Sequence, residues 1–334
     1  MRLSKVIAAA GVLLTAACVP APPPLPPAPL AVACPGCPAP AAITAQAAQL
    51  RQALDLAVPQ NAAAAAGGDA AWIAHAHRAL ATAGLRLRRP QLLVVVDRNP
   101  AVQRLAIVLA DPHGSWRVIG GSKVSTGQAG RRGYFITPTG VFVHDGEIRD
   151  YRALGTFNEN HIRGLGLKGM RVWDFGWQTA EKGWEPDGAT GEMRLLLHAT
   201  DPDSLEPRLG RPASEGCVRI PAAMNRFLDL HGVLDREYEA LARQDPAYAA
   251  VLAPDRQPTP LAGDKLVVID SAAPTLAGPG GPRPPPDRDR GVPPAPAGCA
   301  RCAVTAGASV DAPLSPTGIP APTRPAMDAA RRLP

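Results

Sequence analysis

HATDPDSLEPRLGRPASEGCVRIP, residues 198–221, joins a histidine to a cysteine through a loop that contains several prolines. His198 stands at the end of an apolar run, and Cys217 lies in a Gly–Cys turn nineteen residues later. A cysteine nucleophile needs a partner that takes its proton, and histidine is the usual one. Strand ends and turns commonly display reactive side chains. The stretch therefore suggests a Cys–His pair, against the simpler alternative that Cys217 is a buried core thiol.

Short apolar runs on both sides of this stretch predict a mainly β domain with a few helices. Runs of β-branched or apolar residues bounded by turn residues are typical of strands. Six such runs are QLLVVVD (91–97), RLAIVLA (104–110), WRVIGGSKVS (116–125), GVFVHDG (140–146), MRLLLHAT (193–200) and DKLVVID (264–270). Two helical patterns, residues 222–232 and 235–253, separate Cys217 from the last run. We expect the domain to span residues 90–271.

The first 18 residues are organised like an export signal. Arg2 and Lys5 accompany the apolar run VIAAAGVLL, and the small-residue stretch TAAC ends at Cys18. The apolar run is too short to be a stable membrane span. Cleavage before Cys18 would expose this residue for lipid attachment, as in bacterial lipoproteins, although Thr15 stands where such signals usually have leucine. We expect export to the periplasm or cell envelope, with a lipid anchor at Cys18 or ordinary secretion as the alternatives.

Three further segments flank the expected domain. Residues 19–42 are rich in proline and alanine and predict an extended linker. Residues 43–89 have the spacing of two short helices, with Asp69 as a candidate cap and Gly84 as a stop. Residues 272–334 contain too little apolar surface to fold and are expected to be disordered.

Two Cys-x-x-Cys pairs lie in the flanking segments. Cys34 and Cys37 belong to CPGC, and Cys299 and Cys302 belong to CARC. A shared zinc site is disfavoured because the whole domain separates the pairs, and a redox motif is disfavoured because neither pair lies between a strand and a helix. In an oxidising compartment we expect disulfides, either within each pair or from one pair to the other.

Charge and aromatic content narrow the classes of partner. The chain of 334 residues has a formal net charge of +6, and its basic residues are scattered. Without a basic stripe interleaved with aromatic rings, nucleic-acid binding is disfavoured, whereas an anionic cell-wall polymer fits the charge. Nine of the fourteen aromatic residues fall within residues 134–184. Trp173 and Trp177 are candidate substrate contacts among them, and a small satellite core is the alternative.

The stretch beginning at His198 resembles the active-site motif of L,D-transpeptidases with the YkuD-type catalytic domain. That motif has a first histidine, an intervening loop, Ser/Thr-His-Gly-Cys, and Asn or Arg two positions later. The matching positions hold His198, Ser214, Gly216, Cys217 and Arg219. The runs LLVVVD, VSTGQAG, TPTGVF and LVVID resemble strands and turns of the same domain. The resemblance covers about residues 90–271 and implies the β-sandwich of that family, with no metal or organic cofactor.

One position departs from the family pattern. Glu215 stands where the family has a second histidine, just before Gly-Cys. The first histidine is the one usually assigned as base, so the departure leaves His198 available for that role. Glu215 and Arg219 are candidate substrate contacts. Arg219 has a second interpretation, as a brace for the turn.

The resemblance implies acyl transfer through a thioester on Cys217. His198 is expected to act as general base and proton donor, and Ser214 to orient it. The backbone around Gly216 and Cys217 is expected to donate hydrogen bonds to the oxyanion. The implied substrate is a tetrapeptide stem of peptidoglycan, which loses D-Ala. The acceptor is an amine, from a second stem or from a wall-anchored lipoprotein.

Two alternatives to transpeptidation remain open at the level of sequence. The same Cys–His site becomes an L,D-carboxypeptidase or an amidase if water resolves the thioester. A cell-wall-binding protein without catalysis, in which Cys217 is simply buried, belongs to a different class. The retained motif residues disfavour this last alternative, because a site without chemistry has no need of nucleophile, base and oxyanion donors together.

Overall fold

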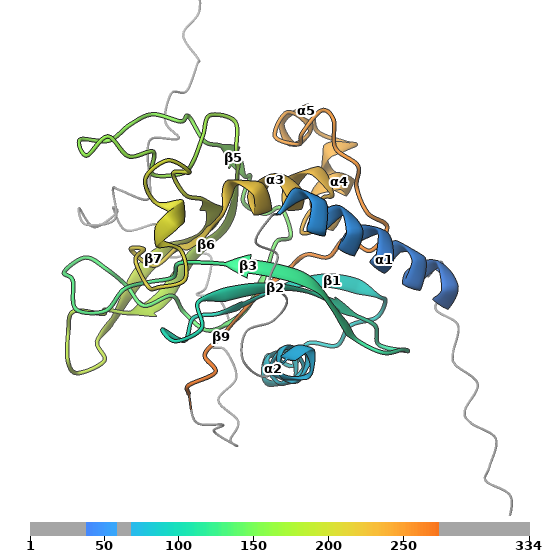
Figure 1. Cartoon of the computed structure of the whole chain (residues 1–334), viewed down its shortest axis with the longest axis horizontal. Coiled ribbons are helices and arrows are strands. Elements are labelled where there is room, and N and C mark those ends of the chain that lie inside the picture. Colours follow the sequence, from blue (N-terminus) through green and yellow to red (C-terminus); the bar gives the residue numbers. More distant parts are fainter. Residues whose placement is uncertain (1–37, 59–67, 274–334) are drawn as a thin grey trace, which may run out of the picture. The chain divides into compact units, whose positions relative to one another are not determined.

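The computed structural model describes residues 38–58 and 68–273 (Figure 1). Its helices are α1 (Pro40–Ala57), α2 (Gly68–Thr82), α3 (Ala222–Leu230), α4 (Arg236–Ala242) and α5 (Pro246–Ala249), with a 3-10 turn at Glu206–Arg208. Its strands are β1 (Gln91–Asp97), β2 (Arg104–Ala110), β3 (Arg117–Lys123), β4 (Gly140–Val143), β5 (Tyr151–Arg152), β6 (Arg171–Glu181), β7 (Thr190–Ala199), β8 (Val218–Ile220) and β9 (Lys265–Ile269).

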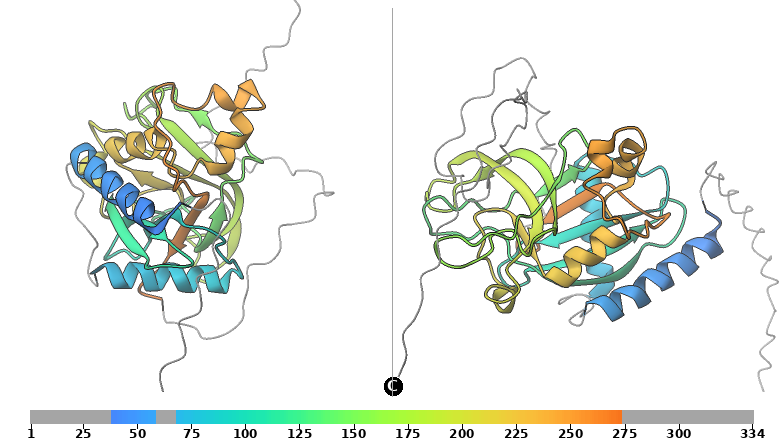
Figure 2. Two further views of the ribbon diagram at one scale, coloured as in Figure 1. Left: turned by 90° about the vertical axis from the view of Figure 1, so that its right-hand side faces the viewer. Right: turned by 90° about the horizontal axis from the view of Figure 1, so that it is seen from above.

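Five strands form the first sheet, in the order β3-β2-β1-β9-β4. Strand β1 is antiparallel to β2 and parallel to β9, and all seven of its residues are buried. A strand covered on both faces has no need of polar alternation, which explains the continuous apolar run QLLVVVD. Helix α2 covers one face with Trp72, Ala76 and Leu80, which recur at the four-residue spacing of one helix face. Figure 2 shows α2 crossing this face of the sheet.

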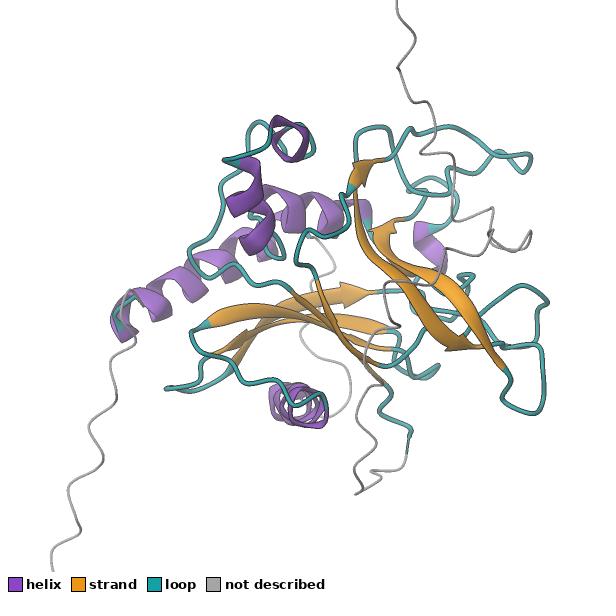
Figure 3. Cartoon of the chain, turned by 180° about the vertical axis from the view of Figure 1, so that it is seen from behind, coloured by secondary structure: helices purple, strands orange, loops and turns teal. Residues whose placement is uncertain are grey.

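The second sheet has the order β5-β6-β7-β8, and its long β6–β7 hairpin stands out in Figure 3. Strand β8 runs parallel to β7 and forms the sheet edge. The main core lies between the two sheets and also receives the buried faces of α1 and α3. From α1 it takes Ile43, Ala47, Leu50 and Leu54. The helices expected before the domain are therefore packed into its cores.

The fold class predicted from the sequence is confirmed: mixed β-sheets with a few helices form a YkuD-like β-sandwich. The runs at 91–97 and 104–110 are strands with those bounds. Strand β6 was not expected, although Trp173, Phe175 and Trp177 recur with the two-residue period of a strand. A glycine-rich context concealed that alternation.

Several expected elements differ in their bounds, two of them in helices other than α3. The helical pattern at 235–253 divides into α4 and α5, because Pro246 cannot continue a helix from the preceding turn. The Asp245 carboxylate caps the new helix by accepting from the Ala247 amide. Helix α1 begins at Pro40, inside the linker expected at 19–42.

Several expectations fall on residues 1–37 and 274–334, outside the described residues. They include the export signal, Cys18, both Cys-x-x-Cys pairs and most of the proline-rich tail. In the described part of the chain, every helix is too short or too polar to cross a membrane.

A short extended segment after β3, residues 124–128, joins the two sheets at the functional region. Ser125 and Arg219 exchange both backbone hydrogen bonds, at 3.0 and 2.9 Å. The Thr126 carbonyl accepts from the amides of Ala213 and Ser214. The loop before β8 is therefore held along its length by backbone pairing, and the residues it carries have fixed positions.

Candidate active site

The parallel pairing of β7 with β8 brings the motif's two ends together. His198 lies opposite Arg219, and Leu197 lies opposite Val218. Cys217 immediately precedes β8, so it lies beside β7, at the spacing of neighbouring strands, about 4.8 Å. Its side chain is 1 % exposed, and Sγ lies 3.6 Å from the Arg194 carbonyl oxygen. The eighteen residues between them thus return the cysteine to the strand that bears the histidine.

The turn that carries Cys217 is fixed by hydroxyl groups. Ser214 Oγ donates to the Cys217 carbonyl at 2.6 Å and accepts from the Gly216 amide at 3.1 Å. Thr137 Oγ1 donates to the Gly216 carbonyl at 2.7 Å. These bonds correct the expectation that Ser214 orients His198: the short serine side chain is turned toward its own loop, where it holds the backbone of the turn that carries Cys217.

Gly216 is required by the shape of this turn. Its φ is +130°, a region that residues with a Cβ rarely adopt. A Cβ at this position would lie 2.5 Å from the Met193 sulfur. Its amide is engaged by Ser214, which corrects its assignment as a ready oxyanion donor. An oxyanion role for the Cys217 amide stays a prediction.

His198 is held in one tautomer. Its Nδ1 lies 2.7 Å from the Ala199 carbonyl oxygen, which can only accept, so Nδ1 carries the proton. Nε2 is buried and has no hydrogen-bond partner among the described residues. Burial, assisted by the charge of Arg219, lowers the pKa of His198 to about 4. At neutral pH the ring is therefore uncharged, with a basic lone pair on Nε2.

Arg219 both contacts its own loop and lines a pocket. One Nη1 hydrogen bond, 3.1 Å to the Ala213 carbonyl, spans the loop and supports the interpretation as a brace. Its Nε is buried without a hydrogen-bond partner among the described residues, and the side chain also lines a pocket. The brace is therefore observed, and the pocket position keeps the substrate contact as a prediction.

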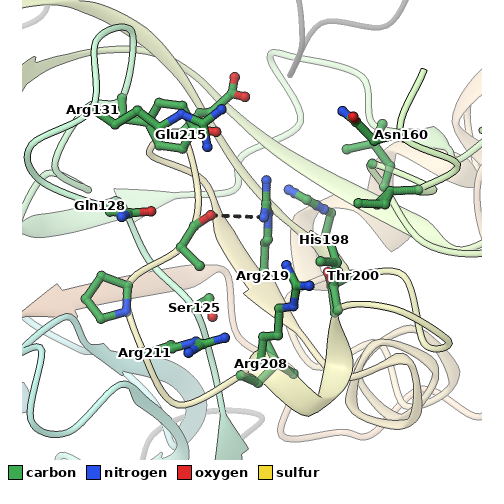
Figure 4. Close-up of a pocket in the computed structure, with 18 of the residues that line it drawn as sticks. Ser125, Gln128, Arg131, Asn160, His198, Thr200, Arg208, Arg211, Glu215 and Arg219 are labelled. Atoms are coloured by element: carbon green, nitrogen blue, oxygen red, sulfur yellow. Dashed lines mark hydrogen bonds between the residues drawn. The ribbon is translucent and has the colours of Figure 1, made fainter. Parts of the chain in front are cut away.

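That pocket has a volume of about 420 Å³. Figure 4 shows Arg219 and His198 side by side, and Glu215 also lines the pocket. The wall combines the segment after β3, the β5–β6 loop, and the loop between β7 and β8. Thr200, Arg208 and Arg211 also line it and were not named from the sequence. The two closely spaced arginines of RLGR (208–211) in the intervening loop were the sequence signal that could have indicated a basic wall.

The two tryptophans proposed as substrate contacts lie elsewhere. Trp173 is 0 % exposed and donates from Nε1 to Asp235 at 3.2 Å, so it is a core residue. This burial corrects the expectation of a substrate-facing ring. Trp177 is 43 % exposed on β6, opposite Arg194, and does not belong to the pocket wall. Its contact with substrate stays a prediction.

A buried cluster of charged residues, which the sequence did not indicate, surrounds Arg171 at the start of β6. Arg171, fully buried, places Nη2 2.7 Å from Asp150 Oδ2 and 3.2 Å from Asp235 Oδ1. His144 Nε2 lies 2.9 Å from the same Asp150 oxygen. Burial alone would lower the pKa of His144, but Asp150 and Asp235 outweigh it and raise that pKa. The ligand atoms of His144, Asp150 and Asp235 lie near enough to one another to hold a metal ion. The Arg171 guanidinium, however, already supplies the positive charge that the two carboxylates need.

Comparison with known families agrees with this geometry. Residues 92–236 match the family model of the YkuD L,D-transpeptidase catalytic domain. The matched segment contains His198 on β7, the turn that carries Cys217, the paired strand β8 and the pocket wall. A search of curated proteins finds no match to the chain.

Proposed function

Since residues 92–236 form an L,D-transpeptidase catalytic domain of the YkuD family, we propose that the protein is an exported enzyme that cross-links or edits peptidoglycan stem peptides. The observation that carries the proposal is the state of His198. It is neutral, is fixed as the Nδ1–H tautomer, and lies on the strand beside Cys217. A base of this kind next to a thiol is what nucleophilic acyl transfer needs.

In the first half-reaction, His198 Nε2 takes the proton from the Cys217 thiol. The thiolate attacks the carbonyl of the bond between the diamino acid and the terminal D-Ala of a tetrapeptide stem. When that bond breaks, the proton on Nε2 passes to the departing amine, and D-Ala leaves as a neutral amine. The stem remains bound to Sγ as a thioester.

In the second half-reaction, an acceptor amine attacks the thioester carbonyl. Its proton moves to His198 Nε2 and then to the departing sulfur, which restores the thiol. Because burial lowers the pKa of His198 to about 4, the imidazolium formed in each step gives up its proton readily. The Ser214 hydroxyl keeps the Cys217 backbone in place through both steps.

Product analysis tests the proposal. The mature protein, incubated with purified disaccharide-tetrapeptides, should release D-Ala and form dimers linked between two diamino acids. Cys217→Ala should abolish both products, and trapping with acid should reveal a covalent stem adduct on the unmodified protein alone. D-Ala release without dimers would indicate the carboxypeptidase instead. A fully inactive wild-type protein would favour the cell-wall-binding alternative.

Export and anchoring are proposed from the leader sequence. Residues 1–42 fused to a reporter should carry it out of the cytoplasm, and substitution of Cys18 separates the two modes. If Cys18→Ser moves the reporter from the membrane fraction to the soluble fraction, a lipid anchor is supported. If the reporter is soluble outside the cytoplasm with both the native leader and the Cys18→Ser leader, ordinary secretion is favoured.

A further inference from the structure

We infer that Arg208 and Arg211 bind the carboxylate on the amine-bearing carbon of the reacting amino acid, so that the enzyme selects amine partners with a free carboxylate. The inference rests on the proposed function and extends it to specificity. Neither arginine belongs to the motif positions that carry the resemblance. Both line the pocket beside His198 and are exposed at its opening.

The charges of the pocket match such a ligand. Arg131, Arg208, Arg211 and Arg219 contribute to the wall, against the single carboxylate of Glu215. Among the described residues, none of the four guanidinium groups has a carboxylate oxygen within 4.0 Å. Unpaired arginines around a concave site are suited to bidentate binding of a carboxylate. Glu215 supplies the opposite charge, which an amino acid's ammonium group can use on entry.

Several arginines away from the pocket, although not all of those described, are paired with aspartates. Arg152, Arg163 and Arg194 each lie 2.6 to 2.8 Å from an aspartate oxygen. Those ion pairs satisfy the guanidinium within the chain, whereas the arginines at the pocket leave their charge for a ligand.

Unsatisfied polar atoms in the pocket wall give a second, independent observation. His198 and Thr200 are 1 % and 0 % exposed, and His198 Nε2 and Thr200 Oγ1 have no hydrogen-bond partner among the described residues. The Nε of Arg219 is in the same state. Buried polar groups are nearly always hydrogen-bonded, so three such atoms around one pocket indicate a place that a polar ligand completes.

The reaction itself says which part of the substrate belongs in the pocket. The pocket wall includes His198 but not Cys217, whose sulfur is directed at the Arg194 carbonyl. The group beside the base is the amine that loses or gains a proton. By microscopic reversibility, the departing amine of D-Ala and the incoming acceptor amine occupy the same position. Both D-Ala and the acceptor centre of a diamino acid bear a carboxylate on the carbon next to that amine.

The loop that carries the two arginines is positioned before any ligand binds. Its Leu209 is buried, and the Gly210 amide donates to the Val124 carbonyl at 2.8 Å. Arg208 closes the 3-10 turn, and Arg211 follows Gly210 directly. Anchored backbone on both sides limits the entropy lost when the guanidinium groups bind an anion.

The test compares two acceptors that differ only in the carboxylate. The mature protein receives tetrapeptide donor with isotope-labelled D-alanine or labelled D-alaninamide, and kcat/KM for exchange into the stem is measured for each. The wild type should prefer the acid by about tenfold or more, which corresponds to about 1.4 kcal/mol. The amine of the amide is less protonated at neutral pH, so amine reactivity cannot produce this preference.

Variants of the pocket arginines test whether they cause the preference for the acid over the amide. The double variant Arg208→Gln/Arg211→Gln should lose the preference, because kcat/KM for the acid falls toward the value for the amide. Thioester formation from the tetrapeptide donor should also slow, since its terminal D-Ala bears the same carboxylate. Arg132→Gln is the matched control, because Arg132 is exposed, follows Arg131 in sequence and does not line the pocket. The control should keep the wild-type ratio.

The outcomes separate this inference from the proposed function. A wild type that forms the thioester but uses acid and amide equally would overturn the inference and leave the function intact. So would a double variant that retains the preference. If the wild type forms neither thioester nor exchange product, the proposed function fails, and the inference fails with it.

Discussion

Replacing His198 with asparagine should remove a large part of the protein's sensitivity to acid. The folded pKa of His198 is about 4, below the ordinary value of 6.5, because the ring is buried and faces Arg219. The unfolded chain therefore binds a proton at this site between pH 6.5 and about 4, and the folded protein does not. The stabilising contribution is fully present above pH 6.5 and is lost as the pH falls toward 4. At 1.36 kcal/mol per pKa unit, the loss amounts to about 3 kcal/mol.

Urea unfolding at two pH values measures the stability that depends on the protonation of His198. Between pH 7.5 and pH 4.5 the wild type should lose about 2.5 kcal/mol more stability than His198→Asn, since most of the titration lies in that interval. Asparagine keeps a donor near the position of Nδ1, so the bond to the Ala199 carbonyl can persist. Other titrating groups, His144 included, are present in both proteins and cancel in the comparison.

Two results would refute the reasoning about His198. Equal losses of stability in the two proteins would mean that the ring is solvated or protonated in the folded state. An NMR titration of the imidazole that showed an ordinary pKa would lead to the same conclusion. In either case the neutral base with a fixed tautomer, on which the mechanism depends, would have to be abandoned.

Three further predictions concern the turn and the buried cluster. Gly216→Ala should lower the melting temperature and reduce D-Ala release, because a residue with a Cβ is strained at this positive φ and the Met193 side chain must move; normal activity would mean that the turn relaxes freely. Ser214→Ala should reduce kcat and cost about 1 to 3 kcal/mol in urea unfolding, since it leaves a buried amide unpaired, whereas the exposed control Ser204→Ala should change neither. Arg171→Leu should destabilise by about 3 to 5 kcal/mol because it removes the guanidinium that pairs with the buried Asp150 and Asp235, and a change below about 1 kcal/mol, the size of a surface ion pair, would contradict that burial.

The sequence predicted what local pattern controls and missed what tertiary contact controls. Runs 91–97 and 104–110 are buried on both faces, so their apolar character is continuous and their bounds are sharp. Strand β6 is buried from Arg171 to Gly176 and mostly exposed from Trp177 onward, and its register with β7 shifts between Asp174 and Trp177, so it has no simple strand pattern in sequence. Its identity comes from pairing with β7, a contact that no local pattern encodes.

The same division applies to the site. Residue types and the resemblance to the family motif proposed His198 and Cys217 as partners, and the parallel pairing of β7 with β8 brings their strands together, while the partnership itself stays a prediction. The partner of Ser214 could not be found in this way, because the direction of a hydroxyl in a turn depends on backbone angles that spacing does not give. The position of Trp173 was predicted wrongly for a related reason. An aromatic ring can pack in a core or lie at a surface, and its burial depends on how the two sheets pack together.

The buried cluster has a consequence for the base that neither stability nor sequence makes obvious. His198 pairs across the sheet with Val172, the residue after Arg171. Arg171 is fixed twice, by its guanidinium on Asp150 and by its backbone, whose amide and carbonyl both bond to the Asn225 side chain. The strand opposite His198 is thus anchored by buried charge on one side and by α3 on the other. A substitution that loosens this anchor should therefore broaden the position of the imidazole and lower kcat more than it raises KM, because the base is displaced while the pocket arginines stay on their own loop.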